Sequence, residues 1–315
     1  MPLDDSAQTV LDIARTAGRP PYETLEPEEA RRVYRAGRSA LQPAPQQVAA
    51  TRDLTAPGPG GPIPLRLYRP LGSDARTRLP LLVYYHGGGW VLGDIETHDV
   101  VCRHLSNASG AAVLSVDYRM GPEHKFPAAV DDSFAALTWA AAQADSLAID
   151  PARIAVGGDS AGGNLSAVLS LLARDRGGPH LALQLLIYPA TDFTGSYASR
   201  QRLGEGYLLT AAAQAWFHRH YLRSDADRLD WRASPILAPS LGGVAPAWVL
   251  TAGFDPLSDE GEAYAKRLID EGVAVATRRF DGQIHGFVTM GRIIPEAARA
   301  LDEAGAALKA AFNAS

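Results

Sequence analysis

One short stretch constrains the fold of this chain more than any other. A β-branched run at residues 153–156 leads into Gly158-x-Ser160-x-Gly162, and an apolar helical pattern from Leu165 to Leu172 follows at once. This order predicts a tight turn between a buried strand and a helix, with glycine where the backbone is crowded. Such a turn lifts a serine hydroxyl above the edge of a sheet. Ser160 is therefore a candidate nucleophile.

The motif needs support from the rest of the chain. At average glycine and serine usage, a Gly-x-Ser-x-Gly match occurs by chance in roughly one chain of this length in ten. The alternative is a glycine-rich turn that only connects a strand to a helix. A free serine is also a poor nucleophile, so the hypothesis requires a base, an orienting acid and an oxyanion site elsewhere.

Length and composition indicate one large α/β domain, or one such domain with a smaller accessory layer. The chain has 315 residues, of which 46% are hydrophobic and 21% are charged, as in ordinary globular proteins. The net charge of -5 gives no electrostatic case for nucleic acid or for an anionic membrane surface as a partner.

The chain also lacks sequence signals for other compartments or for metal binding. No run of about 18 apolar residues is present, which predicts no membrane span. The start of the chain is acidic and does not resemble a signal peptide, so a cytoplasmic location is expected. Cys102 is the only cysteine, which excludes an internal disulfide and a thiolate metal site; we expect it to be buried and inert.

Strand and helix patterns alternate over most of the chain, which predicts a mostly parallel, doubly wound sheet. The expected strands are 65–68, 81–85, 111–116, the run before Ser160, 181–188, 247–251 and 273–279. The expected helices are 10–17, 27–41, 128–144, the run from Ser160 to Arg174, 259–271 and 296–312. Residues 56–64 hold four prolines and three glycines, which favours a hairpin or loop.

Residues 193–235 interrupt this alternation. The segment is rich in aromatic residues and has no strand pattern. A loop-and-helix insertion at this place would lie over the carboxyl ends of the strands, where ligands bind in such sheets. With the helices of residues 1–50 it is expected to form a cap over a catalytic domain of residues 51–315. For any single aromatic residue, simple packing of the insertion on the sheet is an equal alternative.

A glycine run follows the predicted strand 81–85, in the order His86-Gly87-Gly88-Gly89-Trp90. Backbone N–H groups in such a run can approach a developing negative charge without side-chain obstruction. We expect Gly88, Gly89 and Ala161, the residue after the nucleophile, to supply an oxyanion hole; Gly87 is an open alternative. A phosphate loop would need a lysine and a Ser/Thr that are absent, and no dinucleotide fingerprint is present, so no cofactor is expected.

One of the eight histidines has the position expected of a base. His285 lies in a loop after the last predicted strand, which matches the chain order Ser, Asp, His. The others are assigned to the glycine turn (His86), to helix surfaces or packing (His104, His218, His220) or to positions without an evident partner (His98, His124, His180).

Two aspartates compete for the role of the acid. Asp255 follows the strand 247–251 at its carboxyl end, where its side chain can reach a neighbouring loop. Asp259 falls at the expected start of a helix, where a carboxylate gains from capping and from the helix dipole. We therefore expect Asp255 to be the acid of the triad and Asp259 to be structural.

Taken together, these motifs resemble the hormone-sensitive lipase family of α/β-hydrolases, the bacterial esterases with a His-Gly-Gly-Gly motif. The matching residues are His86-Gly87-Gly88-Gly89-Trp90, Asp117-Tyr118-Arg119, Pro122 to Ala129, Gly158 to Asn164, Asp255-Pro256-Leu257 and His285-Gly286-Phe287. The resemblance implies an α/β-hydrolase fold with a sheet of about eight strands and a helical cap. It also implies hydrolysis of short- to medium-chain carboxylic esters, and a possible homodimer follows from it alone.

The expected reaction is acyl transfer from a small-molecule ester to Ser160 and then to water, with His285 as base and Asp255 as its orienting acid. Hydrolysis of a lactone, carbamate or amide, or transfer to an alcohol, would share the same acyl-enzyme and stays open. A receptor for small molecules on a hydrolase fold that has lost its activity is the alternative from another class.

Overall fold

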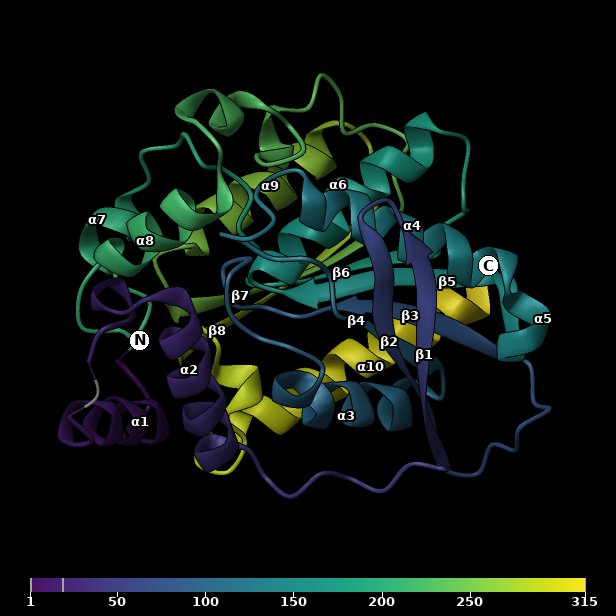
Figure 1. The fold of residues 1–315 in the computed structure, drawn as a ribbon, viewed down its shortest axis with the longest axis horizontal. Coiled ribbons are helices and arrows are strands. Elements are labelled where there is room, and N and C mark those ends of the chain that lie inside the picture. The colour runs from purple at the N-terminus through teal and green to yellow at the C-terminus, as the bar shows by residue number, and fades with distance from the viewer. Residues whose placement is uncertain (1, 19, 315) are drawn as a thin grey trace.

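In the described part of the chain, one sheet of eight strands organises the molecule (Figure 1). The computed structural model describes residues 2–18 and 20–314. The strand order is β1-β2-β4-β3-β5-β6-β7-β8, with antiparallel pairing from β1 through β2 to β4 and parallel pairing elsewhere. The strands are β1 Ala50–Gly58, β2 Gly61–Arg69, β3 Leu79–Tyr85, β4 Ala112–Val116, β5 Ile149–Asp159, β6 Leu183–Ile187, β7 Ala247–Phe254 and β8 Val275–Ile284. The predicted mostly parallel, doubly wound α/β fold is confirmed.

Helices cover both faces of this sheet (Figure 1). α3 (Asp99–Ser109) and α10 (Glu296–Ala314) pack together on one face, whereas α4 (Ala128–Ala142), the short α5 (Ala144–Leu147), α6 (Ala161–Asp175) and α9 (Ser258–Asp270) lie on the other side. Strands β4 and β6 are buried along their whole length. Strands covered on both faces need apolar side chains at consecutive positions, which explains the unbroken apolar runs in the sequence.

The strand β1 was not predicted, for a physical reason. It lies at the edge of the sheet, and most of its residues are exposed. Charged residues such as Arg52 and Asp53 are therefore tolerated, and the apolar signal of a strand is weak. The hairpin expected at 56–64 is confirmed, because β1 pairs with β2 around a turn at Gly58 and Gly61. Several other strands extend beyond their predicted ranges; the largest extensions include the start of β5, at Ile149, and the end of β8, at Ile284.

The N-terminal segment and the segment predicted as an insertion meet at one end of the sheet. The first contains α1 (Asp5–Thr16), the 3-10 turn η1 (Tyr22–Thr24) and α2 (Pro27–Leu41). The second contains α7 (Ala198–Arg202), α8 (Ala211–Tyr221) and the 3-10 turn η3 (Asp225–Leu229), with no strand, as predicted. Figure 1 shows α2 near α8, residues of these two helices share one apolar core, and α8 contacts η1. We call these two segments together the helical layer.

A small apolar core joins the helical layer to the glycine loop. Its buried members come from α2, from α8 and from the segment after the glycines: Ala30, Tyr34, Val91, Leu92, Ala213, Trp216 and Phe217. Arg31 of α2 adds polar anchors, because its guanidinium pairs with Glu123 at 2.7 Å and donates to the carbonyl oxygens of Val91 and Gly121, both at 2.8 Å. The N-terminal helices are thus tied to the hydrolase core by both kinds of contact.

Two expectations from composition can be compared with the fold. Cys102 is completely buried in α3, as predicted, and this burial raises the pKa of its thiol well above the ordinary value. Within residues 2–18 and 20–314, no helix is both long enough and apolar enough to cross a membrane.

Candidate active site

The turn that carries Ser160 is held in a conformation that few residues adopt. Ser160 lies between β5 and α6 with φ +56° and ψ -115°, which costs on the order of 1–3 kcal/mol and requires support from its surroundings. Both flanking glycines are needed, because a Cβ atom at Gly158 or Gly162 would collide with the carbonyl oxygen of Tyr85 on the neighbouring strand. The predicted tight turn between strand and helix is therefore present.

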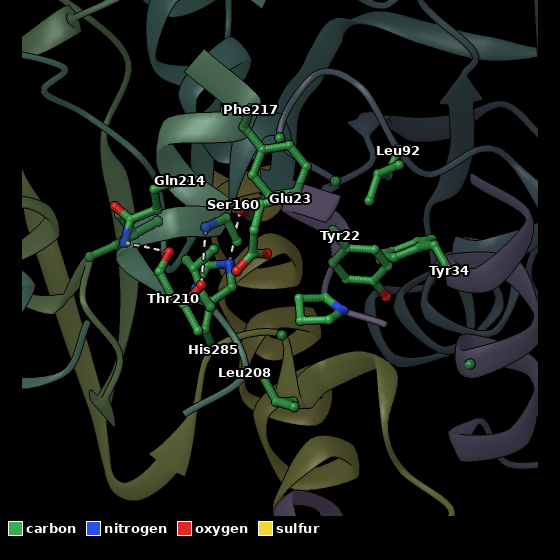
Figure 2. Close-up of a pocket in the computed structure, with 18 of the residues that line it drawn as sticks. Tyr22, Glu23, Tyr34, Leu92, Ser160, Leu208, Thr210, Gln214, Phe217 and His285 are labelled. Atoms are coloured by element: carbon green, nitrogen blue, oxygen red, sulfur yellow. Dashed lines mark hydrogen bonds between the residues drawn. The ribbon is translucent and has the colours of Figure 1, made fainter. Parts of the chain in front are cut away.

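The fold brings the three residues predicted as a triad into one hydrogen-bonded chain. Asp255 follows β7 and His285 follows β8, so both lie at the same edge of the sheet as Ser160. The Ser160 Oγ atom lies 2.9 Å from His285 Nε2, and His285 Nδ1 lies 2.7 Å from Asp255 Oδ2. Figure 2 shows Ser160 and His285 facing each other. The Asp255 carboxylate is completely buried, and its other oxygen accepts a bond from the Leu257 N–H at 2.8 Å.

The second aspartate of this loop points elsewhere. The Asp259 carboxylate accepts a hydrogen bond from the backbone N–H of Ser199, at the start of α7, at 2.8 Å. It therefore serves a structural contact, as expected, but it holds α7 rather than capping the helix α9 that contains it.

The three glycines of the loop differ in whether their backbone N–H groups are already hydrogen-bonded within the protein. The Gly87 N–H donates to Asp159 Oδ1 at 2.9 Å and is thereby occupied. Gly88 and Gly89 have φ values of +124° and +62°, which favour glycine, and both line the cavity above Ser160. In the described part of the chain, neither of their N–H groups has a hydrogen-bond acceptor. The alternative of Gly87 as an oxyanion donor is disfavoured by this geometry.

Asp159 is the residue of this region that sequence reasoning missed. Its carboxylate accepts bonds from the Tyr84 hydroxyl at 2.7 Å and from Gly87, and it lies 3.3 Å from His98 Nε2. Burial raises its pKa, but His98 and the hydrogen bonds outweigh burial and hold the pKa far below the ordinary range. No partner of His98 was evident from the sequence, because Asp159 is distant along the chain and becomes adjacent only through the fold.

His86 has the structural position that was predicted for it. The ring is buried and stacks on Tyr118 with a centroid distance of 4.5 Å, and its Nδ1 lies 2.8 Å from the Gly87 carbonyl oxygen. Burial and, to a smaller extent, the nearby His98 lower the pKa of His86 to about 4. A neutral, stacked imidazole therefore shapes the first turn of the glycine loop.

A cavity of about 370 Å³ opens above these residues. Its floor contains Ser160, His285 and the glycines 88 and 89, and its walls come from α1, η1, α2, α8 and the loops around them. Figure 2 shows Tyr22 and Tyr34 on one side of the cavity and Thr210 and Gln214 on the other. The walls are mostly apolar, which suits a small organic ligand with one polar reacting group.

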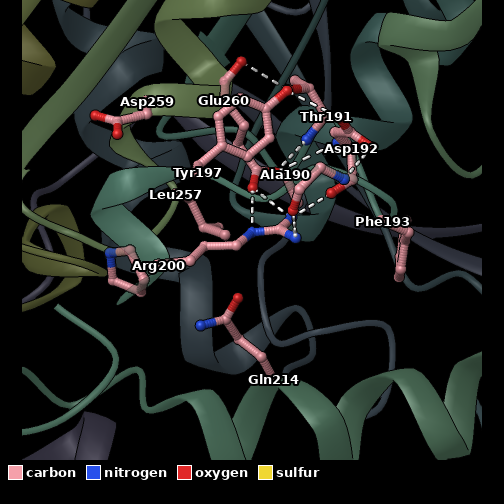
Figure 3. A network of polar contacts seen from close by, with 12 residues as sticks. Ala190, Thr191, Asp192, Phe193, Tyr197, Arg200, Gln214, Leu257, Asp259 and Glu260 are labelled. Atoms are coloured by element: carbon pink, nitrogen blue, oxygen red, sulfur yellow. Dashed lines mark hydrogen bonds and ion pairs between the residues drawn. The ribbon is translucent and has the colours of Figure 1, made fainter. Parts of the chain in front are cut away.

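A buried polar network ties one wall to the site (Figure 3). Arg200 of α7 donates to the completely buried Glu260 of α9 at 2.9 Å, and the Thr191 N–H donates to the same carboxylate at 2.8 Å. Arg200 also donates to the carbonyl oxygens of Gly195 and Asp192. The network closes the loop before α7 onto the helix that follows Asp255. Isolated charges in the sequence gave no signal for it.

Asn164, the last residue of the serine motif, has a structural role that was not evident from the sequence. Its side-chain amide donates to the carbonyl oxygens of Ala190, at 2.8 Å, and Ala233, at 2.7 Å. These residues lie near the two ends of the predicted insertion 193–235. The helix after Ser160 therefore anchors both ends of that segment.

Comparisons with known proteins identify the family of this chain. Residues 82–289 match a family model described as the alpha/beta hydrolase fold. The chain is 47% identical to carboxylic ester hydrolase LipN of Mycobacterium tuberculosis over 98% of this chain and 83% of the relative. It is 40% identical to ethyl acetate hydrolase of Pseudomonas putida over 91% of this chain and 92% of the relative.

A solved structure is similar over its full length. The hyperthermophilic esterase from the archaeon Pyrobaculum calidifontis superposes with a TM-score of 0.93 at 45% identity and covers 98% of this chain and 99% of its own. The chain therefore belongs to the α/β hydrolase fold family, among its carboxylic ester hydrolases, as the motifs of the hormone-sensitive lipase group predicted.

Proposed function

We propose that this carboxylic ester hydrolase works through an acyl-enzyme on Ser160. His285 takes the proton of the Ser160 hydroxyl as the oxygen attacks the ester carbonyl, and Asp255 holds the imidazole in the required tautomer. His285 then protonates the departing alcohol, and water releases the acid in a second, equivalent step. The observation that carries this proposal is the chain of two bonds, 2.9 Å and 2.7 Å, that joins the three side chains.

The oxyanion of the tetrahedral intermediate is assigned to the N–H groups of Gly88, Gly89 and Ala161. Two observations support this choice: the first two groups have no acceptor within residues 2–18 and 20–314, and Gly87 is engaged by Asp159. Fixed donors of this kind stabilise the charge that develops during attack, by about 3 kcal/mol for each donor.

Esters with short to medium acyl chains are the proposed substrates. The cavity of about 370 Å³ lies at the small end of the range for drug-sized ligands and is closed on several sides by helices. A role of the helical layer as a cap is part of this proposal. The cytoplasmic location and the homodimer stay predictions from sequence and resemblance.

The test compares hydrolysis of p-nitrophenyl butyrate by the wild type and by Ser160→Ala, after circular dichroism has shown that both are folded. We expect turnover by the wild type and a loss of at least about a thousandfold in kcat for the variant. Asp259→Asn is a matched control, because Asp259 follows Asp255 closely, in the first turn of α9, but its carboxylate contacts Ser199. An acyl-length series from acetate to decanoate then measures the size of the pocket.

Each other outcome has a definite meaning. Activity that survives in Ser160→Ala would refute the nucleophile assigned here. A folded wild type that turns over no ester in the series would instead favour a receptor, or a hydrolase of lactones, amides or carbamates. If an added alcohol is converted to its butyrate ester in place of release of the free acid, the enzyme is an acyltransferase.

A further inference from the structure

Most charged groups that line the cavity already have partners within the protein. Glu260 is paired with Arg200, and Asp159 is held by Tyr84, Gly87 and His98. Asp192 accepts bonds from the Tyr197 hydroxyl and from the backbone of Thr194. These groups stabilise the walls and leave little capacity for a ligand.

Arg38 is the exception among the cationic lining residues. It projects from α2 into the cavity wall, and within residues 2–18 and 20–314 it forms no ion pair with a carboxylate. Its guanidinium donates a hydrogen bond from Nη1 to Thr289 Oγ1 at 2.8 Å, and the Tyr34 side chain is a further hydrogen-bond partner. The guanidinium also lies 4.8 Å from the centre of the Tyr34 ring. A guanidinium has five N–H donors, so most of its donor capacity is unused.

The position of Arg38 places this charge beside the reacting groups. A Cβ atom built on Gly286, the residue directly after His285, would lie 3.0 Å from Arg38 Nη2. Arg38, His285 and Ser160 all line the same cavity. A ligand that reaches Ser160 with its ester group can therefore contact Arg38 with another part of the same molecule.

The groups around Arg38 do not neutralise it. Burial opposes its charge, while Tyr34, Tyr22 and Tyr188 favour it, and the pKa of Arg38 ends above its ordinary value. Burial raises the pKa of Tyr34 itself to about 12, so this phenol is neutral at neutral pH. A guanidinium in a largely enclosed wall without a counter-ion is costly, and a carboxylate from a ligand would offset that cost through paired, charge-assisted bonds.

One anionic residue of the wall acts in the opposite sense. Glu23 of η1 lines the cavity and forms no ion pair within the described ranges. It is not among the main groups that perturb Arg38, which are the three tyrosines. Its charge should weaken the binding of an anion without cancelling the local field of the guanidinium.

We propose that Arg38 forms an anion subsite in the ester cavity, and that the enzyme accepts esters that carry a free carboxylate, such as monoesters of short dicarboxylic acids. The proposal rests on the proposed function, because it names a substrate class for the same site. The ester carbonyl lies at Ser160, and the distal carboxylate pairs with the Arg38 guanidinium. Recognition of this kind determines specificity and adds no step to the reaction.

The test uses pairs of esters that differ only in charge. Monoethyl glutarate is compared with ethyl 5-methylhexanoate, in which an isopropyl group replaces the carboxylate, and monoethyl adipate is compared with ethyl 6-methylheptanoate. Hydrolysis is followed by titration of the released acid at pH 7.5. The measured quantity is the ratio of kcat/KM for the acidic ester to that for its neutral partner, because a general loss of activity cancels in this ratio.

For Arg38→Met we expect the ratio to fall by about tenfold or more, since a bond to a charged partner is lost. Arg38→Lys should retain part of the preference, because it keeps the charge but not the planar fork. Glu23→Gln should raise the ratio above that of the wild type.

Three results would overturn the subsite. They are an unchanged ratio in Arg38→Met, a ratio in Arg38→Lys no higher than in Arg38→Met, and a wild type that hydrolyses the neutral esters but neither acidic one. A wild type that hydrolyses none of the four esters would instead refute the proposed function itself.

Discussion

The floor of the cavity and the helical layer above it are built by different physics. On the floor, Ser160, Asp255 and His285 follow strands of one sheet, and their neighbours are buried main-chain groups and tyrosines. The helical layer consists of short helices with many exposed residues, joined to the sheet by a small apolar core and a few ion pairs. The floor is therefore positioned by the whole fold, whereas the layer is positioned by a limited number of contacts.

This difference separates chemistry from selection. A reaction that depends on bonds of 2.9 Å and 2.7 Å needs a rigid support, which parallel strands with full hydrogen bonding supply. The proposed substrate preference depends on Arg38, which lines the cavity from α2 and is not part of the sheet. Substitutions on the floor should therefore reduce the rate, while substitutions in the helical layer should alter stability or preference.

The largest effect is expected from breaking the Arg200–Glu260 ion pair, which holds α7 of the helical layer to α9. Arg200→Met leaves Glu260, which is completely buried, without its cationic partner. Loss of one partner of a buried pair costs about 3–5 kcal/mol in the free energy of unfolding, measured by urea denaturation. Burial, opposed by Arg200, raises the pKa of Glu260 to about 7, so the loss should be greater at pH 8.5, where the carboxylate is charged, than at pH 5.5.

The double variant Arg200→Met/Glu260→Gln is the control for this prediction. It removes both charges and should recover part of the lost stability. A single variant that loses less than about 1 kcal/mol would show that the pair does not hold this wall, in contrast to the range expected for a broken buried pair.

The next effect concerns the floor. Asp159→Asn weakens the bonds to Gly87 and Tyr84 and its contact with His98, so the glycine loop loses its fixed position beside Ser160. We expect kcat for p-nitrophenyl butyrate to fall by about 10- to 100-fold, with a smaller change in KM, because Asp159 positions the oxyanion donors and does not bind the ester. Asp175→Asn, at the exposed far end of α6, is the matched control and should retain wild-type kcat. If the variant loses activity only in proportion to the fraction of enzyme that is unfolded, the role of Asp159 is purely structural.

A fall in pH should reduce the free energy of unfolding through one buried, neutral histidine in each of the two regions. Burial lowers the pKa of His86, on the floor, to about 4, and that of His218, in α8, to about 3. Because these values lie below that of a histidine in the unfolded chain, about 6.5, the unfolded chain binds more protons in this range. Their contribution to stability is complete above about pH 6.5 and is lost as the pH falls toward these values, by at most about 1.4 kcal/mol per pH unit for each histidine.

Urea denaturation between pH 7 and pH 5 measures this slope. His218→Phe, which fills a site already packed against Phe193, should reduce the slope, whereas His180→Gln, at an exposed position, should leave it unchanged. A slope in His218→Phe that equals the slope of the wild type would contradict the prediction for α8.

The smallest effect is expected from Arg31, which holds α2 to the hydrolase core. Arg31→Ala removes a pair with Glu123, whose side chain is 52% exposed, together with two bonds to carbonyl oxygens. We expect a loss of about 1 kcal/mol or less in global stability, because exposed pairs contribute little. The substitution should nevertheless accelerate the amide hydrogen exchange of α2 more than that of α6. Equal acceleration in both helices would mean that the helical layer and the core unfold as one unit.

Much of the fold could be predicted because its signals are local. The buried central strands require consecutive apolar residues, and the turn at Ser160 requires glycine at 158 and 162, so both leave marks in short windows of sequence. The strand β1 left no such mark, since an edge strand tolerates charged and exposed residues. The missed start of β5 has the same cause, because Pro151 and Ala152 are exposed. The missed end of β8 is mostly buried, and there Asp281, Gly282 and Gln283 interrupt the apolar pattern.

The sequence alone determined the type of reaction site: a serine on a tight turn, a glycine loop after a strand, and an acid and a histidine in chain order. Only the tertiary structure decided which neighbours complete it. Asp159 meets Gly87 and His98 across 72 and 61 positions of the chain, and Arg38 reaches the loop of His285 from the N-terminal helices. Such contacts between distant segments depend on how helices and strands pack in three dimensions, and no local pattern of residues encodes them.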